Sequence, residues 1–309
     1  QGYWIINNWK FFELTSRIEY ARKSLETSKK LASKQSVEGC WKITHGNKKW
    51  RGVVSTVDNT FAALGLLETY KVTKSEEFLK SAEAWANYLI QNVGFHKYDY
   101  GYSIKYFSGK PSPAVPNNNT LVLWFLAELS NVTRNIEYIR FNERIIDFLE
   151  KVQKETGELP YSVESSEVVG KEHYICFQYN AFELIDLLNF YRISPVKKLD
   201  RIIIRLSKFL LQAFDEKGAS KFDCSHSFPN IFYYTSKVIS ALLLSKKFGF
   251  IDNVPFINNS LNLLLSNQNI DGSFPYSTNE YMFFKDKRFY PKESNFILSA
   301  LLEIHSINK

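Results

Sequence analysis

The chain has few cysteines and no long apolar run. Its 309 residues include three cysteines, Cys40, Cys176 and Cys224, which are too few and too widely spaced for a disulfide framework. Reduced cysteines and a cytoplasmic location are therefore expected. No run of about eighteen apolar residues occurs, and the first residues show no signal-peptide pattern. We expect no transmembrane segment.

Residues that interrupt regular structure are also scarce. The chain has nine prolines and thirteen glycines, whereas apolar residues make up 45% of it and aromatic residues 16%. This composition can bury a large core and excludes a disordered chain. Runs of β-branched residues are short, and none alternates cleanly over more than about five residues, which favours helices over strands.

Positive charge exceeds negative charge, with 39 lysines and arginines against 32 acidic residues and a formal net charge of +7. The lysines are spread along helical segments, which is typical of a solvated surface, and a weak preference for an acidic ligand stays open. No basic helix with interleaved base-reading side chains stands out. We expect no nucleic-acid partner, and the oligomeric state is left undetermined.

A turn pattern recurs along the chain. Each copy holds a glycine among polar and aromatic residues, as in KYDYGYSI (97–104) and NIDGSFPYS (269–277). The glycines are Gly39, Gly101, Gly157, Gly218 and Gly272, which lie 62, 56, 61 and 54 residues apart. Such an interval fits one pair of helices with its connections.

Two kinds of helix alternate with these turns. After each turn comes a long, mostly apolar segment that opens on a small polar pair, and the second members of the pairs are Thr60, Thr120, Asn180, Thr235 and Asn295. Asn, Ser and Thr are favoured at helix starts because their side-chain oxygens accept hydrogen bonds from first-turn amides. The other kind is amphipathic and is expected at residues 75–92, 142–155, 199–214 and 255–268, after an opening helix at about 9–34.

These patterns predict an all-α fold of about five inner and five outer helices, closed into an α/α toroid (barrel). The period near 60 residues exceeds the roughly 34–47 residues typical of helical solenoids, the nearest rival architecture. No linker rich in Pro, Gly or Ser divides the chain. We therefore expect a single α/α-toroid domain spanning residues 1–309.

The turn NQNIDGSFPYS (267–277) resembles the Gln-x-x-Asp-Gly-Ser-aromatic motif of the α/α-toroid superfamily of terpenoid cyclases and protein prenyltransferases, of six-hairpin type. ETGELPYS and FDEKGASKF are weaker copies. In that superfamily the motif ties the end of an outer helix to the next inner helix. The resemblance thus implies a structural role for Gln268, Asp271 and Gly272.

The chemistry of that superfamily is mostly missing. No Asp-x-Asp-Asp acid and no Asp-Asp-x-x-Asp magnesium box occurs, which argues against terpenoid cyclisation. Protein prenyltransferases hold zinc with an Asp, a Cys and a distant His, and Asp223, Cys224 and His226 offer these residue types. His173 and Cys176 in the preceding repeat would complete a four-ligand set, although a free Cys176 also suits a buried core position. We expect no cofactor and keep zinc as the alternative.

A second resemblance concerns Asp223 and His226, which stand three residues apart before an aromatic-rich helix. The pair is similar to an Asp-x-x-His pattern of uncharacterised α/α-toroid proteins associated with surface-polysaccharide biosynthesis. Such proteins also have an Asp-x-Gly-Tyr loop, matched at 99–102, and a basic-aromatic motif, matched at 288–290. The resemblance implies a polysaccharide context.

Tyrosines and histidines gather in the segments that precede the inner helices, and in a toroid these segments open on one mouth. Aromatic faces stack on sugar rings, while hydroxyl, amide and imidazole groups exchange hydrogen bonds with sugar hydroxyls, so a glycan ligand is the leading interpretation. The expected catalytic residues are Asp223, His226, Tyr234, His173 and Arg288. The expected substrate-binding residues are Asp99, Tyr102, Asn119, Asn180, Tyr233 and Tyr290.

These residues favour a carbohydrate-active enzyme that acts on a polysaccharide or oligosaccharide. A lyase or epimerase of uronic acids needs a base, an acid and a group that neutralises the carboxylate, and Arg288 suits the last role. A glycosidase needs two facing carboxylates, which the sequence does not pair. Two other classes stay open, namely an isoprenoid-binding or prenyltransferase-like protein with zinc, and a non-catalytic module that binds a glycan or a protein.

Overall fold

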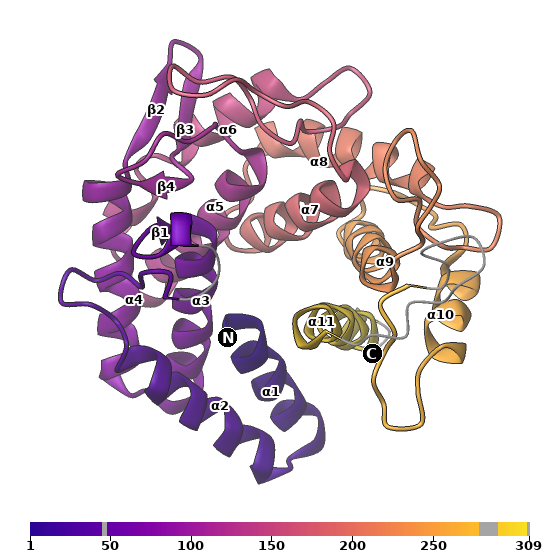
Figure 1. Cartoon of the computed structure of the whole chain (residues 1–309), viewed down its shortest axis with the longest axis horizontal. Coiled ribbons are helices and arrows are strands. Elements are labelled where there is room, and N and C mark those ends of the chain that lie inside the picture. Colours follow the sequence, from indigo (N-terminus) through magenta and orange to yellow (C-terminus); the bar gives the residue numbers. More distant parts are fainter. Residues whose placement is uncertain (45–47, 278–289, 308–309) are drawn as a thin grey trace. The chain divides into compact units, whose positions relative to one another are not determined.

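A computed structural model describes residues 1–44, 48–277 and 290–307, and the regular structure in these ranges is almost all helical (Figure 1). The described ranges hold eleven α-helices and four short strands. Contacts divide the chain into two compact units, residues 1–151 with 162–170 and residues 152–161 with 171–309. The single domain over residues 1–309 stays a prediction.

The first unit alternates buried and half-exposed helices. These are α1 (Gly2–Thr15), α2 (Ile18–Ala32), α3 (Thr56–Thr73), α4 (Glu76–Tyr88), α5 (Pro116–Thr133) and α6 (Asn142–Val152). Helix α3 packs against α1, α4 and α5, and both α3 and α5 bury residues on nearly every side. Helices α2, α4 and α6 each keep one polar face exposed. This alternation of inner and outer helices is the predicted one, with outer helices close to their predicted bounds.

The N-terminal region differs from the single helix predicted at about residues 9–34. Ser16 adopts a left-handed conformation (φ 55°) and separates α1 from α2. Helix α1 buries Ile5 and Trp9, and the Trp9 indole donates a hydrogen bond of 2.9 Å to the hydroxyl of Thr69 on α3. Helix α1 is thus a further inner helix, and the described ranges contain six inner and five outer helices instead of five of each.

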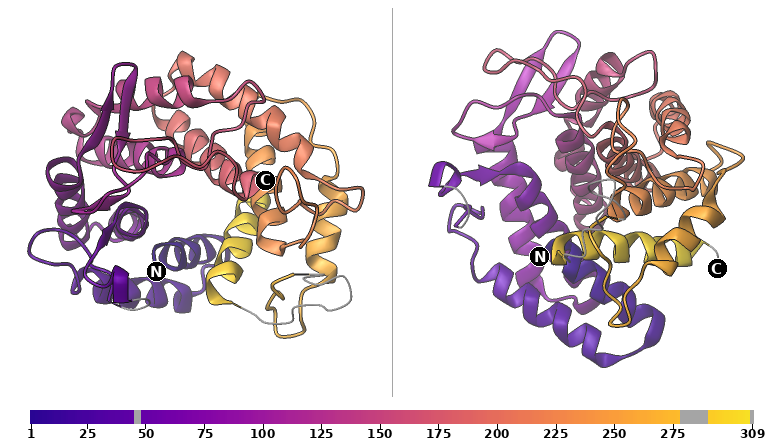
Figure 2. Two further views of the ribbon diagram at one scale, coloured as in Figure 1. Left: turned by 45° about the horizontal axis from the view of Figure 1, so that its top comes forward. Right: turned by 45° about the vertical axis from the view of Figure 1, so that its right-hand side comes forward.

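Short strands and single helical turns connect the helices of the first unit. Strand β1 (Val54–Ser55) pairs with β4 (Phe107–Ser108), and β2 (Phe95–Tyr98) pairs with β3 (Gly101–Ile104), both antiparallel. Figure 2 shows the β2–β3 hairpin projecting beyond the helices of its unit. A π-helical turn follows α4 at Leu89–Val93, and short 3₁₀ helices form at Lys48–Trp50 and Ile136–Ile139.

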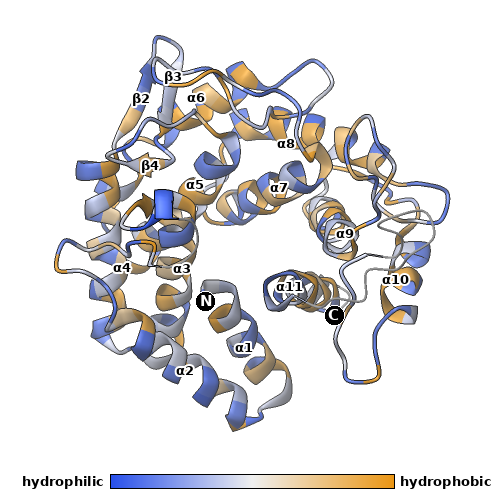
Figure 3. Cartoon of the chain, in the orientation of Figure 1, coloured by the Kyte–Doolittle hydropathy of each residue, from blue (hydrophilic) through white to orange (hydrophobic). Residues whose placement is uncertain are grey.

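The second unit repeats the same plan with α7 (Cys176–Ile193), α8 (Lys197–Leu210), α9 (Phe232–Lys247), α10 (Ile257–Ser266) and α11 (Pro291–Ile307). Helix α9 packs against both α7 and α11, and a 3₁₀ turn, Leu211–Ala213, extends α8 (Figure 1). Helix α8 buries Leu199, Ile202 and Leu206 completely while its basic side chains face solvent, and Figure 3 shows both characters on this helix. Burial of this apolar face is what fixes an amphipathic outer helix to the core.

Four of the five turn glycines pack their turn closely against the outer helix that follows it, and Gly272 of the last turn makes no such contact. Gly157 has a φ of +96°, and a Cβ atom there would lie 2.2 Å from the carbonyl oxygen of Arg205 on α8. Gly39, Gly101 and Gly218 are crowded in the same way by atoms of α4, α6 and α10. Only glycine fits such a contact, so the interval of about 60 residues in the sequence marks a repeated packing contact.

Glutamines reinforce the same contact. The side-chain amide of Gln153 donates hydrogen bonds to the carbonyls of Gly157 and of Ile202 on α8, at 2.9 and 3.0 Å. Gln35 makes the equivalent pair of bonds in the first turn. In the last turn Gln268 donates to the Gly272 carbonyl, and Asp271 accepts from the Ser273 amide. The motif residues bond within their own turns, which fits the predicted structural role. Gln35 and Gln153 also bond to the next outer helix, whereas a bond to the next inner helix was expected.

Asparagines attach the turns to the inner helices. Helix α7 begins at Cys176, so Asn180 lies one turn inside it and not at its start. The Asn180 amide donates to the carbonyls of Cys176 and Leu159 at 2.9 and 3.0 Å, and its oxygen accepts from the Leu159 amide at 2.8 Å. Asn59 and Asn119 hold their own turns in the same way. The prediction that the polar pairs cap the inner helices was therefore wrong. Asparagine is common both at helix starts and at positions where a side chain binds a distant turn, so the residue type does not distinguish the two roles.

Among the described residues, no helix combines the length and the apolar character that crossing a bilayer requires. The cytoplasmic location stays a prediction.

Candidate active site in the second unit

Tyrosines gather where α7, α9 and α11 begin. The tyrosine cluster consists of Tyr161, Tyr174, Tyr179, Tyr233, Tyr234, Tyr276 and Tyr290. The ring of Tyr161 lies 4.9 Å from that of Tyr174 and 5.0 Å from that of Tyr179, and the Tyr233 and Tyr234 rings are 4.6 Å apart. Tyr276 and Tyr290 are 5.3 Å apart. The amide of Phe232, next to Tyr233, donates to the Tyr276 carbonyl at 3.2 Å, and Tyr233 interacts electrostatically with Tyr174, which indicates that the groups are neighbours.

The cluster combines exposed rings with buried ones. Tyr174 is 41% exposed and Tyr290 36%, so both can receive a ligand from solvent. Tyr234 is 2% exposed, and burial raises the pKa of Tyr233 and of Tyr234 far above the ordinary value for tyrosine. Both hydroxyls therefore stay protonated near neutral pH. A phenolate base at Tyr234 does not fit this environment. Its buried ring instead packs against that of Tyr233.

Asp223 and His226 form a pair in the loop that precedes α9. The Oδ1 atom of Asp223 accepts hydrogen bonds from the backbone amides of Ser225 and His226, and from Nδ1 of His226 at 2.9 Å. Burial opposes ionisation of Asp223, but these hydrogen bonds outweigh it and hold the pKa of the carboxyl below its usual value. The His226 side chain is 69% exposed. Its Nδ1 is thus anchored by a carboxylate while the opposite edge of the ring faces solvent.

This pair adjoins the tyrosine cluster. The ring of Phe222, next to Asp223 in the chain, lies 5.8 Å from the ring of Tyr234. The backbone amide of Cys224 donates to the sulfur of Cys176, the first residue of α7. The loop with the acid–histidine pair therefore contacts two of the three helices that carry the cluster, α7 and α9.

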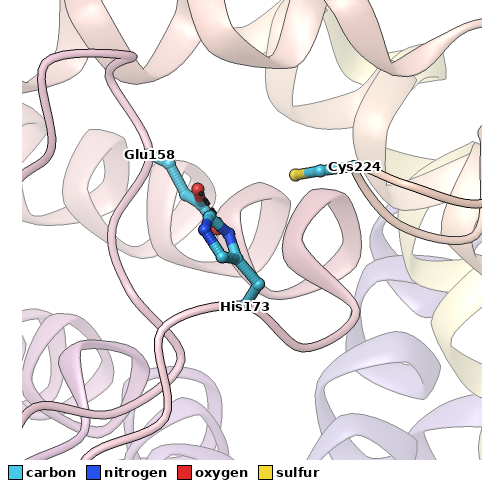
Figure 4. Close-up of side chains that lie close together, drawn as sticks. All are labelled: Glu158, His173 and Cys224. Atoms are coloured by element: carbon cyan, nitrogen blue, oxygen red, sulfur yellow. Dashed lines mark hydrogen bonds and ion pairs between the residues drawn. The ribbon is translucent and has the colours of Figure 1, made fainter.

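A second acid–histidine pair lies in the same unit. Glu158, directly after Gly157, is 2% exposed, and its carboxylate lies 3.1 Å from Nδ1 of His173 (Figure 4). Burial raises the pKa of Glu158, against the opposing effects of His173 and Lys154. The Nε2 atom of His173 lies 3.4 Å from the ammonium group of Lys154, which also binds Glu172 at 2.6 Å. Both nitrogens of His173 thus have neighbours, unlike the outer edge of His226.

The cysteines correct one prediction. Cys176 and Cys224 form a disulfide, although 48 residues separate them. Cys40 is a free and buried cysteine. The expectation of three unpaired cysteines was wrong. Cys176 and Cys224 lie where the chain enters two neighbouring inner helices, and the repeat brings these two segments together. The distance between them in space cannot be read from their spacing in the sequence.

The residues offered for the alternative zinc site are only partly brought together, and zinc stays a prediction. Within the ranges that the structure describes, one group of potential metal ligands is found, namely Glu158, His173 and Cys224, whose ligand atoms lie within 4.8 Å of one another. Asp223 and His226 are not part of it, since they bind each other. Figure 4 shows the sulfur of Cys224 pointing toward the Glu158–His173 pair. The observed group shares Cys224 and His173 with the residues offered for zinc, and Glu158 was not among them.

The remaining predicted site residues lie elsewhere. Asp99 and Tyr102 belong to the β2–β3 hairpin of the first unit, where Arg144 donates to the Asp99 carbonyl and stacks its guanidinium 5.0 Å from the Tyr102 ring. The amides of Asn119 and Asn180 are buried and bonded to backbone, so we do not include them in the site. Arg288 lies outside the described residues.

Two acidic residues of the second unit escaped the sequence reasoning. Glu158 occupies the position after a turn glycine, and aligning the five turns by their glycines would have exposed an acidic residue there. Glu183 on α7 is 1% exposed, and its Oε2 atom has no hydrogen-bond partner among the described residues. Burial, with Asp186 and Glu158 nearby, raises the pKa of Glu183 well above its ordinary value.

No known protein family matches the sequence, and no curated protein matches it. Solved structures do match. Cellobiose 2-epimerase from Bacillus thermoamylovorans aligns with a TM-score of 0.78 and 11% identity over 98% of this chain and 85% of that one. A family 105 glycoside hydrolase from C. acetobutylicum aligns at 0.74 and 15% over 99% and 92%, and a polysaccharide lyase at 0.69 and 16% over 99% and 88%.

These alignments establish the fold. The chain is all-α and has the α/α-toroid fold of those enzymes, as the repeat of inner and outer helices predicted.

Proposed function

We propose that this chain is a carbohydrate-active enzyme that moves a proton at a sugar carbon, as epimerases and lyases do. The observation that carries the proposal is the Asp223–His226 pair, whose imidazole is anchored on one edge and open on the other beside a cluster of tyrosines. The three solved structures of the same fold carry names of sugar-modifying enzymes, which supports this class of substrate.

Each group has a distinct task in the proposed reaction. His226 takes the proton from a sugar carbon through its solvent-facing nitrogen, and Asp223 keeps the ring oriented and stabilises the imidazolium that forms. Tyr174 and Tyr290 offer exposed aromatic faces for stacking on sugar rings. The protonated hydroxyl of Tyr233 is a hydrogen-bond donor that can stabilise negative charge developing on the substrate, and the buried hydroxyl of Tyr234 is hydrogen-bonded to Tyr233 and orients it.

The proposal narrows the five predicted catalytic residues. His173 is left out because Glu158 and Lys154 lie against its two nitrogens. Tyr234 is kept as a residue that orients Tyr233 and not as a base. A uronic acid is our preferred substrate because the net charge of +7 favours an anionic polymer, and a surface-polysaccharide context stays part of the proposal.

Hydrolysis is the second candidate. A glycosidase needs a carboxylic acid with a raised pKa beside an ionised carboxylate. Burial raises the pKa of Glu158, while hydrogen bonds lower that of Asp223. The disulfide between Cys176 and Cys224 links the start of α7 to the loop that holds Asp223. The 2% exposure of Glu158 argues against it, since a general acid must reach the glycosidic oxygen. A terpenoid-cyclase-like or prenyltransferase-like activity and a non-catalytic binding role have no comparable observation in their favour.

Nuclear magnetic resonance in heavy water tests the proposal. The protein is incubated with neutral and with uronic-acid oligosaccharides, and the products are followed over time. Epimerisation places deuterium on one sugar carbon, elimination produces an unsaturated uronate, and hydrolysis produces reducing ends without deuterium on carbon. Deuterium or unsaturation in the wild type and in His305→Ala, but not in His226→Ala, would support the proposal. Reducing ends alone would replace it with hydrolysis.

A further inference from the structure

Four potential metal ligands from three segments of the second unit converge beside the acid–histidine pairs. Glu158 comes from the turn after α6, His173 from the loop before α7 and Cys176 from the first residue of α7, and Cys224 from the loop before α9. Ligand atoms of Glu158, His173 and Cys224 lie within 4.8 Å of one another, and the sulfur of Cys176 is bonded to that of Cys224. We propose that the reduced protein binds one zinc ion through these four side chains.

The donor set selects the metal. Two thiolates, one imidazole and one carboxylate are the ligand types that zinc takes in tetrahedral protein sites, whereas calcium and magnesium require oxygen. A tetrahedral site needs four donors on different sides of the ion, and here they come from three separate segments. Figure 4 shows the carboxylate and the imidazole side by side, with the sulfur of Cys224 directed at them. The ion would lie between that sulfur and the Glu158–His173 pair.

The surroundings supply what a zinc site needs beyond its ligands. Glu158 and Cys176 are each 2% exposed, so two of the four donors approach from the protein interior. The backbone amide of Cys224 points at the Cys176 sulfur from 2.9 Å, the kind of hydrogen bond that stabilises a zinc-bound thiolate. Zinc neutralises two of the three anionic ligands, and the ammonium group of Lys154, which is shared with Glu172, lies 3.4 Å from His173 beside the negative charge that is left.

Zinc and the disulfide are alternative states of the same two cysteines. A dithiol reductant transfers two electrons and two protons to the disulfide, which yields two thiols and an oxidised reductant. Zinc then displaces the two thiol protons to solvent and binds both thiolates. Both states tie the loop of Asp223 and His226 to the start of α7, so either can hold the proposed catalytic loop in place. The proposal does not depend on the proposed reaction, because binding of zinc is measured directly.

The test begins with the full chain, reduced by a dithiol and then freed of it without oxygen. Zinc chloride is titrated in competition with a chromophoric chelator, and bound zinc is counted by elemental analysis. We expect one zinc per chain in the reduced protein and none in the oxidised protein. Cobalt(II), used as a probe, should give the thiolate-to-metal absorption of a tetrahedral site.

Variants assign the ligands. Removing a residue that only hydrogen-bonds to a metal ligand weakens metal binding by about 10–100-fold. Loss of a ligand itself should cost more, so Cys176→Ser, Cys224→Ser and His173→Ala should each weaken zinc binding at least about a hundredfold. Glu158→Gln keeps the shape of the side chain and should weaken binding while the circular dichroism spectrum stays native. Cys40→Ser is the matched control and should bind zinc as the wild type does. Reduced wild type without zinc, or both cysteine variants with wild-type affinity, would overturn the proposal.

Discussion

One carboxylate oxygen of Asp223 fixes both the backbone and the ring of His226. It accepts the His226 backbone amide at 2.7 Å and the ring Nδ1 at 2.9 Å. Because these contacts close within a few residues, the orientation of the imidazole is set by its own loop. The other edge of the ring is left to solvent, where a substrate can reach it.

Removing the imidazole should therefore abolish chemistry while leaving substrate binding intact. General-base catalysis contributes about 10²–10⁴-fold, so we expect kcat to fall by that factor in His226→Ala. Asp223→Asn should lower kcat less, because the ring stays in place but loses its anionic partner. Calorimetry should give an unchanged dissociation constant in both. His305→Ala, a histidine far from this loop in the sequence, is the control. Near-wild-type turnover in His226→Ala would refute the assignment.

The exposed rings of the tyrosine cluster predict a stacking contribution to affinity. Tyr174 is 41% exposed, its ring meets that of Tyr161 edge-on at 4.9 Å, and the Lys171 ammonium lies 4.0 Å from its centroid, so we expect a sugar to stack on the ring in place of Lys171. Aromatic stacking is worth about 0.5–1.5 kcal/mol, so Tyr174→Ala should weaken oligosaccharide binding by roughly two- to tenfold. Tyr174→Phe keeps the face and should retain most of the affinity. Equal losses in the two variants would indicate a role for the hydroxyl instead.

The fold was predictable because its signals are periodic. A glycine every 60 residues or so and an apolar segment after each turn are visible without a structure. The glycine reflects a packing contact made in four of the five turns. The extra helix α1 was missed because it ends just before Ser16, whose backbone adopts the left-handed conformation, and no glycine or proline marks that position. Asn180 shows a second limit, since its type is shared by helix caps and by side chains that clamp a neighbouring turn.

The site was only partly predictable because its members lie far apart in the chain. The local pair of Asp223 and His226 was identified, since three residues of spacing within a loop already bring the side chains together. Glu158 and His173 are fifteen residues apart, and a fold-dependent path through the loop before α7 unites them. The disulfide of Cys176 and Cys224 depends on contact between two repeats, which spacing along the chain does not encode.

The asparagine clamp predicts a large stability loss from one small change. Asn180→Ala removes three hydrogen bonds and leaves the amide and carbonyl of Leu159 unsatisfied inside the unit. Each buried unpaired group costs about 1–3 kcal/mol, so we expect unfolding free energy to fall by about 2–4 kcal/mol. Urea unfolding measures the loss. Asn131→Ala, on the exposed surface of α5, should change it by less than about 0.5 kcal/mol. Equal midpoints for the two variants would rule out the clamp.

The turn glycines predict a difference between two substitutions with the same backbone strain. Gly157 and Gly249 both have positive φ, +96° and +78°, so alanine at either costs roughly 1–2 kcal/mol. At Gly157 the new Cβ would also lie 2.2 Å from the Arg205 carbonyl oxygen, whereas at Gly249 it meets nothing within 4 Å. Overpacking adds about 1–3 kcal/mol, so Gly157→Ala should melt at the lower temperature. Identical melting temperatures would show that the contact yields without cost.

His96 predicts how the stability of the first unit depends on pH. It is 6% exposed, and burial lowers its pKa below the ordinary 6.5, with the charge of Glu167 opposing and that of Lys105 adding to the shift. The unfolded chain therefore binds a proton more readily than the folded one, and stability must fall as the pH drops through 6.5 toward the lower folded value.

The lowered pKa of Glu167 acts in a separate window. Its stabilising effect is present above the ordinary 4.5 and is lost only as the pH falls further, so Glu167 does not contribute between pH 7.5 and 5. The shifted pKa values of Glu158, Glu183 and the N-terminal amine affect wild type and a His96 variant alike, so the difference between the two proteins isolates the histidine. His96→Gln keeps a polar atom near Ser112 but cannot take up a proton in this range. We expect its melting temperature to vary less with pH than that of the wild type, while His305→Ala, which removes an exposed histidine, should follow the wild type. Parallel curves for His96→Gln and wild type would mean that another group carries the acid sensitivity.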